Sequence, residues 1–190
     1  MIDCYITDRR TLSGSLLDAI ARNLAAGVTW VQIREKDLSA RALFELVDAA
    51  RKLPNPQNSK IIVNTRADVA IAAGAAGVHL PSGSPAPHTW RTIAPSDFLI
   101  GVSCHSVDDV RNAEKEGADY IVFGPVFPPL SKSAALEPRG LEGLARAAEA
   151  VTIPVLALGG VTRENTGACI SAGAAGVAGI TIFQDTLRAC

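Results

Sequence analysis

Hydrophobic positions in this chain gather in short runs that alternate with amphipathic stretches from one end to the other. Eight runs are rich in Val and Ile and apolar almost throughout: residues 2–7, 28–33, 61–64, 77–80, 99–103, 120–123, 155–158 and 177–180. Such runs are typical of parallel strands that helices cover. Helical periodicity lies between them, most clearly over residues 15–26, 40–53, 107–116, 141–150 and 165–172. The alternation predicts a parallel α/β fold.

A glycine-led turn recurs where a helical stretch passes into an apolar run. It starts at Gly27, Gly74, Gly117 and Gly173, so it precedes every second run. Helices commonly end at a left-handed residue, and glycine adopts that conformation most easily. Four such pairs make eight strands, which favours a closed TIM (β/α)8 barrel over a doubly wound open sheet.

The length of the chain fits one compact barrel domain over residues 1–190 and is short for two domains. It is also small for a barrel, so we expect economies in the outer helices. These are a minimal helix around residues 85–93 and a final helix cut short at Cys190. Only residues 53–59 and 125–140 read as long loops.

Composition and charge exclude several classes of function. The net charge is −1 and the isoelectric point is near 6.3, so no basic surface for nucleic acid or an anionic membrane is indicated. No apolar run reaches the ~18 residues that span a bilayer, and the first residues read as a strand rather than a signal peptide. The four cysteines have no zinc-site spacing. We expect a cytoplasmic protein without nucleic-acid or membrane partners.

The clearest chemical signal is a cluster of cations at the end of the second run. In a barrel, working residues lie at the carboxyl ends of the strands and in the loops that follow. Alternation along a strand places Gln32, Arg34 and Lys36 on one side and Glu35 on the other. A guanidinium fork beside a lysine charge suits a diphosphate. The competing interpretation is a surface ion pair of these cations with Glu35 and Asp37.

A second phosphate site is indicated after the seventh and eighth runs. Bare backbone N–H groups in these two loops form the usual phosphate cradle of a barrel, and the residues concerned are Gly159, Gly160, Gly179, Ile180 and Thr181. The loop after the sixth run is long and proline-punctuated, and it carries Lys132. Lys132 is a candidate to close over a phosphate, and a solvated loop lysine is the alternative.

Several short motifs, in order along nearly the whole chain, resemble those of one family. They are Val-Gln-Ile-Arg-Glu-Lys at 31–36, Ile-Val-Asn-x-Arg-x-Asp-Val-Ala at 62–70, Gly-Val-His-Leu at 77–80, Gly-Val-Ser-x-His at 101–105, Gly-Ala-Asp-Tyr at 117–120, Gly-Pro-Val-Phe-Pro at 124–128 and Gly-Leu-Glu at 140–142. The pattern is similar to thiamine phosphate synthase and equally to its relatives, the TenI-type thiazole tautomerases.

The resemblance implies ligands and roles for the residues at the barrel mouth. The synthase joins hydroxymethylpyrimidine diphosphate to thiazole phosphate with Mg²⁺. By resemblance, the diphosphate is held by Gln32, Arg34, Lys36 and Asn64, with help from Ser103 and Lys132. Gly160 and residues 179–181 would take the thiazole phosphate. The implied partners are small phosphorylated thiazole and pyrimidine ligands, and a homodimer stays open.

Two positions depart from the family where magnesium ligands are expected. Thr65 and Ser84 stand where the synthase usually has aspartates. Sites of this class need one or two protein carboxylates besides the substrate phosphates. The sequence therefore predicts no metal ligand at these positions, and Mg²⁺ would be held only by substrate, or by Glu35 or Asp68 if either reaches it. We predict weak or no Mg²⁺-dependent synthase activity.

Proton transfer, which a tautomerase needs, has fewer candidates. Pro125 stands where that branch often places a catalytic histidine. His105 and His79 are the candidates, because imidazole titrates near neutral pH. Lys132 is the third candidate catalytic residue, through its closure over a phosphate. A structural hydrogen-bonding role for either histidine is the alternative.

Several functions remain open from the sequence. The favoured one is a thiazole-phosphate-binding enzyme of thiamine biosynthesis, either TenI-like or a synthase with altered metal use. The alternatives are an authentic Mg²⁺-dependent synthase and a binding protein without catalysis. An unrelated phosphate-handling barrel is disfavoured by the ordered motifs.

Overall fold

Eight parallel strands close into a barrel in the order in which they occur along the chain. The structure, a computed structural model, describes residues 1–128 and 137–184. The strands are β1 (Ile2–Ile6), β2 (Trp30–Ile33), β3 (Lys60–Asn64), β4 (Gly77–Leu80), β5 (Leu99–Cys104), β6 (Tyr120–Phe123), β7 (Val155–Ala157) and β8 (Gly176–Gly179). β8 pairs with β1, which closes the sheet. The predicted TIM barrel is confirmed, and each strand lies within two residues of its predicted bounds.

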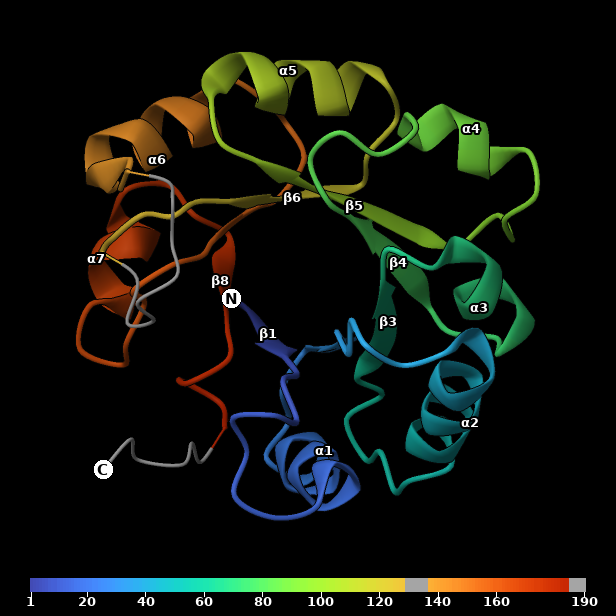
Figure 1. Ribbon diagram of the computed structural model, residues 1–190. Helices are drawn as coiled ribbons and strands as arrows, with labels where there is room; N and C mark the ends of the chain where they lie inside the picture. Colours follow the sequence, from blue (N-terminus) through green and yellow to red (C-terminus); the bar gives the residue numbers. More distant parts are fainter. Residues whose placement is uncertain (129–136, 185–190) are drawn as a thin grey trace.

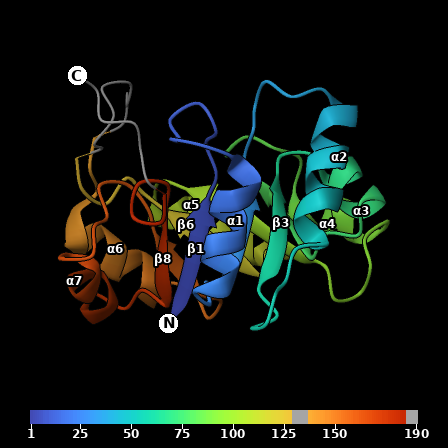
Figure 2. The same cartoon turned by 90° about the horizontal axis from the view of Figure 1, so that it is seen from below.

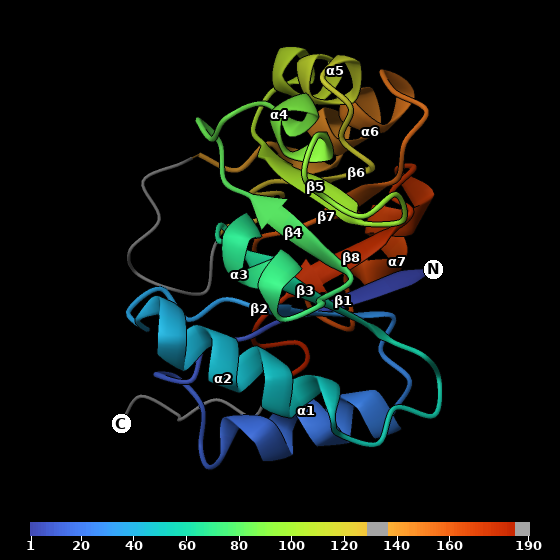
Figure 3. The ribbon, with the colours of Figure 1, turned by 90° about the vertical axis from the view of Figure 1, so that its right-hand side faces the viewer.

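Helices form a ring around the strands, as Figure 1 shows. They are α1 (Leu16–Ala25), α2 (Ala40–Arg51), α3 (Ala67–Ala72), α4 (Pro87–Arg91), α5 (Val107–Lys115), α6 (Gly140–Glu149) and α7 (Thr166–Ser171). Figure 2 shows the N-terminus at one end of the barrel and the loops after β1 and β2 at the opposite end. In Figure 3, α1 and α2 pack side by side on one flank, and α4, α5 and α6 lie on the other.

Local sequence explains where three of the longer helices begin. Ser15, Ser39 and Ser106 are the N-caps of α1, α2 and α5, and each hydroxyl accepts the backbone N–H three residues on. A serine cap of this kind typically stabilises a helix by about 1 kcal/mol. α4 is the expected minimal helix. α3 (six residues) was not predicted, whereas α7, equally short, was.

The barrel interior is filled by side chains from alternate strand positions. The rings of Trp30 and Tyr120 lie 4.6 Å apart and tilted at 55°. Gly101 makes room for them, because a Cβ there would lie 2.0 Å from Tyr120 Cζ. Smaller apolar side chains complete this layer: Cys4, Ile6, Ile62, Val122, Leu156 and Ala178.

The next inward-facing positions, nearer the carboxyl ends of the strands, carry polar side chains. Gln32, Asn64, His79 and Ser103 each follow an interior residue by two positions in β2 to β5. The apolar layer therefore carries a polar layer above it. Among the described residues, no helix has the length and apolar character needed to cross a membrane. The expected final helix before Cys190 lies outside the described residues.

Candidate functional site

A cavity of about 540 Å³ opens at the carboxyl ends of the strands. Loops after β2 and β3 supply its charged and polar wall, and residues of β5 and the loop after β7 supply the opposite side. Its lining includes Arg34, Lys36, Asn64, Thr65, Arg66, Ser103 and Leu158. The structure thus brings together four of the predicted ligand-binding residues, Arg34, Lys36, Asn64 and Ser103. We call this cavity the mouth.

Gln32 lies at the base of the mouth beside Asn64. Its side-chain Nε2 donates to Asn64 Oδ1 at 2.9 Å, and Asn64 Nδ2 in turn donates to Thr65 Oγ1 at 2.7 Å. Gln32 is 1% exposed, and its Oε1 is buried with no hydrogen-bond partner among the described residues. A buried acceptor without a donor costs about 1–3 kcal/mol, so this atom points to a ligand that supplies an N–H or O–H.

The cations of the mouth are free of the acids that competed for them in the sequence. Glu35 and Asp37 both bind Arg9 instead, with Nη1 at 3.1 Å from Glu35 Oε2 and 2.7 Å from Asp37 Oδ1. Arg9 holds the pKa of Asp37 below its usual value through these hydrogen bonds. Within residues 1–128 and 137–184, Arg34 and Lys36 have no acidic partner. The surface ion-pair interpretation is therefore wrong.

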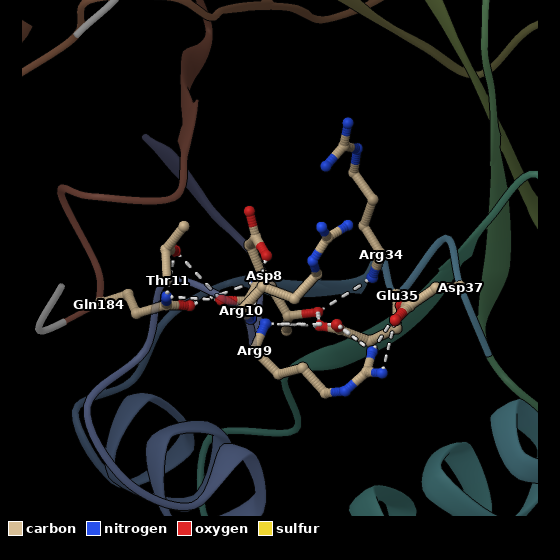
Figure 4. Close-up of polar contacts among 9 residues, drawn as sticks. Asp8, Arg9, Arg10, Thr11, Arg34, Glu35, Asp37 and Gln184 are labelled. Carbon is tan, nitrogen blue, oxygen red and sulfur yellow. Dashed lines mark hydrogen bonds and ion pairs between the residues drawn. The ribbon is translucent and has the colours of Figure 1, made fainter. Parts of the chain in front are cut away.

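Arg34 is held at the mouth by its backbone. Its N–H donates to Thr7 Oγ1 at 3.0 Å, and the Thr7 hydroxyl donates to the buried Glu35 carboxylate at 2.6 Å. In Figure 4, Glu35 points toward Arg9 while the Arg34 side chain extends the opposite way, toward the middle of the barrel. Arg34 and Glu35 thus lie just after β2 rather than in it, and their side chains point to opposite sides as predicted.

Arg10 is a cation that the sequence analysis missed. Figure 4 shows its guanidinium on the same side as that of Arg34. The turn that carries it is fixed, because the Arg10 N–H donates to Asp8 Oδ1 at 3.1 Å and Gln184 Nε2 donates to the Asp8 carbonyl at 2.9 Å. Like Arg34, Arg10 has no acidic side chain paired with its guanidinium in the part of the chain that the structure describes. Its place just after β1 was the available signal.

His79 is buried beneath the mouth rather than exposed in it. Its Nε2 lies 2.8 Å from Ser103 Oγ, and its Nδ1 lies 3.3 Å from the Tyr120 hydroxyl. Burial, with a smaller contribution from the charge of Arg34, lowers the pKa of His79 to about 3. The imidazole is therefore neutral at physiological pH, and only Ser103 connects it to the cavity.

His105 lies apart from the cationic mouth. It lines a second cavity, of about 690 Å³, between α5 and α6, together with Arg111, Arg139 and Arg146. Its Nδ1 donates to the Gly124 carbonyl at 2.5 Å. The structure does not bring His105 together with Arg34 and Lys36, so its catalytic role stays a prediction. Lys132 lies outside the described residues.

The two glycine loops have free backbone donors, as the phosphate cradle requires. The N–H groups of Gly159, Gly160, Ile180 and Thr181 have no backbone acceptor among the described residues. Gly159 and Gly160 have φ of 92° and 61°, which favours glycine. Packing also demands glycine, because a Cβ on Gly160 would lie 2.5 Å from the Pro128 carbonyl oxygen. The loops after β6 and β7 are therefore held against each other.

The residues present do not fit a magnesium ion. Thr65 lines the mouth but its hydroxyl accepts from Asn64, while Ser84 lines a different cavity. Glu35 is engaged by Thr7 and Arg9, and Asp68 by Arg66 at 2.6 Å. In the described parts of the chain, no three His, Cys, Asp or Glu side chains gather as metal ligands do.

Thr65 also has an unusual backbone. Its φ is 67°, a left-handed conformation that is rare for a β-branched residue, and its N–H donates to the His79 carbonyl at 2.8 Å. Asp and Asn adopt this conformation more easily than Thr. The backbone at position 65 would therefore suit an aspartate or asparagine better than the threonine that is present.

Comparisons with known proteins agree with this geometry. The family model described as thiamine monophosphate synthase matches residues 4–183. A putative thiamine-phosphate synthase of Geobacter sulfurreducens is 47% identical over 175 residues, covering 91% of this chain and 82% of its own. The thiamine-phosphate synthase of Chlorobium luteolum is 42% identical, covering 94% of this chain and 82% of its own.

A solved structure carries the same fold. The thiamine phosphate pyrophosphorylase from Pyrococcus furiosus superposes with a TM-score of 0.84 at 34% identity, covering 95% of this chain and 86% of its own. The family model and these relatives cover the barrel and the mouth together. The chain belongs to the thiamine monophosphate synthase family.

Proposed function

We propose that this protein is a thiamine phosphate synthase, which joins hydroxymethylpyrimidine diphosphate to thiazole phosphate and releases diphosphate. The observation that carries the proposal is the unpartnered Gln32 Oε1, buried beneath cations that have no acidic partner among the described residues. An aminopyrimidine diphosphate supplies what both lack, an N–H donor and an anion. The names of the relatives support the same activity.

The mouth cations would stabilise the departing diphosphate. The carbon–oxygen bond to the pyrimidine methylene breaks with its electron pair going to the diphosphate, and the thiazole nitrogen lone pair forms the new bond to that carbon. Charge develops on the leaving oxygens, so fixed positive groups lower the barrier. In this proposal the task falls to Arg34 and Lys36, which line the mouth, and to Arg10 on the same side, and no metal ligand of the protein is required.

Bond formation between the thiazole nitrogen and the pyrimidine methylene carbon needs no proton transfer, and this separates the synthase from the tautomerase. A tautomerase must move a proton, and the described mouth holds no histidine that titrates near neutral pH: His79 is buried with a pKa of about 3, and His105 lines another cavity. The arrangement therefore favours the synthase over the TenI-like activity.

The thiazole phosphate has a separate place in this proposal. The unpaired N–H groups of Gly160, Ile180 and Thr181 would bind its phosphate oxygens. Leu158 precedes them and lines the mouth, so a phosphate held there leaves the thiazole ring facing the pyrimidine site.

The test incubates the purified protein with both substrates and follows thiamine phosphate and released diphosphate. We expect stoichiometric formation of both products, with turnover retained in part when divalent metal is chelated. No product under any metal condition contradicts the proposal. A parallel assay follows aromatisation of the thiazole carboxylate phosphate tautomer, and acceleration there without synthase turnover would favour the TenI-like alternative.

A further inference from the structure

Three polar side chains from neighbouring strands form a chain of hydrogen bonds that ends in the mouth. Tyr120 on β6, His79 on β4 and Ser103 on β5 are linked in that order at 3.3 Å and 2.8 Å. Tyr120 is fully buried and His79 is 3% exposed. Only Ser103 lines the cavity.

The direction of this chain follows from counting donors and acceptors. Burial raises the pKa of Tyr120 well above its ordinary value, so the phenol keeps its proton. Among the described residues, the Tyr120 hydroxyl has one hydrogen-bond partner, His79 Nδ1. If Nδ1 carried the imidazole proton, the Tyr120 O–H would be a buried donor without an acceptor, which is costly. The favoured arrangement therefore has Tyr120 donating to Nδ1.

The rest of the chain is then determined. A neutral imidazole has one protonated nitrogen, so a hydrogen bond accepted at Nδ1 requires the proton at Nε2. Nε2–H donates to Ser103 Oγ. The Ser103 hydroxyl proton has no acceptor within the described part of the protein and is directed into the mouth.

We propose that Tyr120 and His79 are positioning residues that fix Ser103 as a hydrogen-bond donor to the ligand. The inference rests on the proposed function only in taking the ligand to be an acceptor, either a diphosphate oxygen or a pyrimidine ring nitrogen. In the opposite direction, the Ser103 hydroxyl would donate to His79 Nε2, and only its oxygen lone pairs would face the ligand.

The protonated nitrogen of His79 gives the first test. Long-range proton–nitrogen NMR spectra of the full chain, labelled at histidine, identify it, with His79→Gln assigning the signal. We expect the Nε2–H form in the wild type and a shift toward Nδ1–H in Tyr120→Phe, which loses the donor but keeps the ring. An Nδ1–H form in the wild type overturns the proposal.

A double-mutant cycle on ligand binding gives the second test. Binding of inorganic pyrophosphate and of unphosphorylated hydroxymethylpyrimidine is measured by calorimetry for the wild type, Ser103→Ala, Tyr120→Phe and the double variant. For the ligand that accepts from Ser103, we expect about a tenfold or greater loss with Ser103→Ala and a smaller loss with Tyr120→Phe. In the Ser103→Ala background, Tyr120→Phe should change nothing further.

The outcomes separate this inference from the proposed function. Equal effects of Tyr120→Phe in both backgrounds would show that it acts through general structure, and the inference fails while the synthase proposal stands. Binding of neither ligand by the wild type, together with no product, counts against the proposed function, and the NMR result still tests the direction of the chain. Thermal unfolding of each variant shows that all four proteins are folded when binding is measured.

Discussion

The side-chain nitrogen of Gln32 donates to Asn64 Oδ1 at 2.9 Å, and this bond turns the Gln32 carbonyl oxygen into a buried acceptor with no partner among the described residues. Gln32 and Asn64, on neighbouring strands, thereby present one hydrogen-bond acceptor to a ligand. The unpaired oxygen destabilises the free protein, and a bound ligand that donates to it removes that destabilisation.

Replacing Gln32 separates binding from stability. Gln32→Met removes the unpaired oxygen together with the bond to Asn64, so we expect the free energy of unfolding to stay within about 1 kcal/mol of the wild type. Synthase kcat/KM should fall by about ten- to hundredfold, since the aminopyrimidine loses its acceptor. Urea unfolding and steady-state kinetics measure the two effects. A large loss of stability with unchanged kcat/KM would assign Gln32 a structural role.

Arg10 should contribute to anion binding despite its exposure. Arg10→Gln is expected to weaken pyrophosphate binding by about fivefold, because one exposed charge contributes roughly 1 kcal/mol. The affinity should also fall less steeply with added salt. Arg41→Gln is the matched control, since Arg41 lies on α2 and pairs with Glu45 at 3.0 Å. Equal affinities for the two variants in calorimetry would remove Arg10 from the site.

A single substitution at Thr65 should make pyrophosphate binding depend on Mg²⁺. We expect Thr65→Asp to keep or raise stability, because aspartate tolerates the left-handed φ of 67° better than threonine. Without metal, the added carboxylate should weaken pyrophosphate binding by repulsion, and Mg²⁺ should restore it. Thr65→Asn is the control, with the same backbone tolerance and no charge.

Calorimetry measures the pyrophosphate affinity of the three proteins in the presence of Mg²⁺ and of a chelator. The wild type and Thr65→Asn should bind pyrophosphate with little response to chelation. Complete loss of wild-type binding on chelation would contradict the view that protein cations neutralise the diphosphate.

Burial of neutral His79 makes stability depend on pH. Its pKa is lowered from 6.5 to about 3, so between these two pH values His79 is protonated in the unfolded chain and neutral in the folded chain. The stabilisation is complete above pH ~6.5 and is lost as the pH falls toward ~3. Between pH 7 and pH 5, we expect the wild type to lose about 2 kcal/mol more than His79→Gln. Urea unfolding at both values measures it, and NMR should show His79 neutral at pH 5.

The architecture followed from local patterns for a physical reason. Strands buried on both faces must be apolar throughout, and covering helices must show a 3.6-residue repeat, so β1 to β8 and five of the helices could be located from single runs of residues. α3 was not located, although α7 has the same length of six residues, so length alone does not explain the difference. The rule that barrel sites lie after the strands then selected Gln32, Arg34, Asn64 and Ser103 without any coordinates.

Those local patterns could not show which residues far apart in the sequence lie next to each other in the structure. The sequence could list His79 and His105 as equal candidates, yet one is buried under Ser103 and the other lines the cavity between α5 and α6. It also offered Glu35 and Asp37 as partners for the mouth cations, whereas both bind Arg9 from the loop after β1. Such outcomes depend on where loops meet across the barrel.

The sequence by itself determined the barrel, the family, the cationic residues of the mouth and the presence of Thr65 and Ser84 at the positions where metal ligands were expected. Alternation and periodicity are local properties, and chemistry follows directly from residue type. Only the tertiary structure decided what surrounds the mouth: the guanidinium of Arg10 on the same side as that of Arg34, the unpaired oxygen of Gln32, and the hydrogen-bond chain from Tyr120 to Ser103. Pairing and burial arise from residues far apart in sequence, so their consequences for charge and for proton position appear only when the barrel closes.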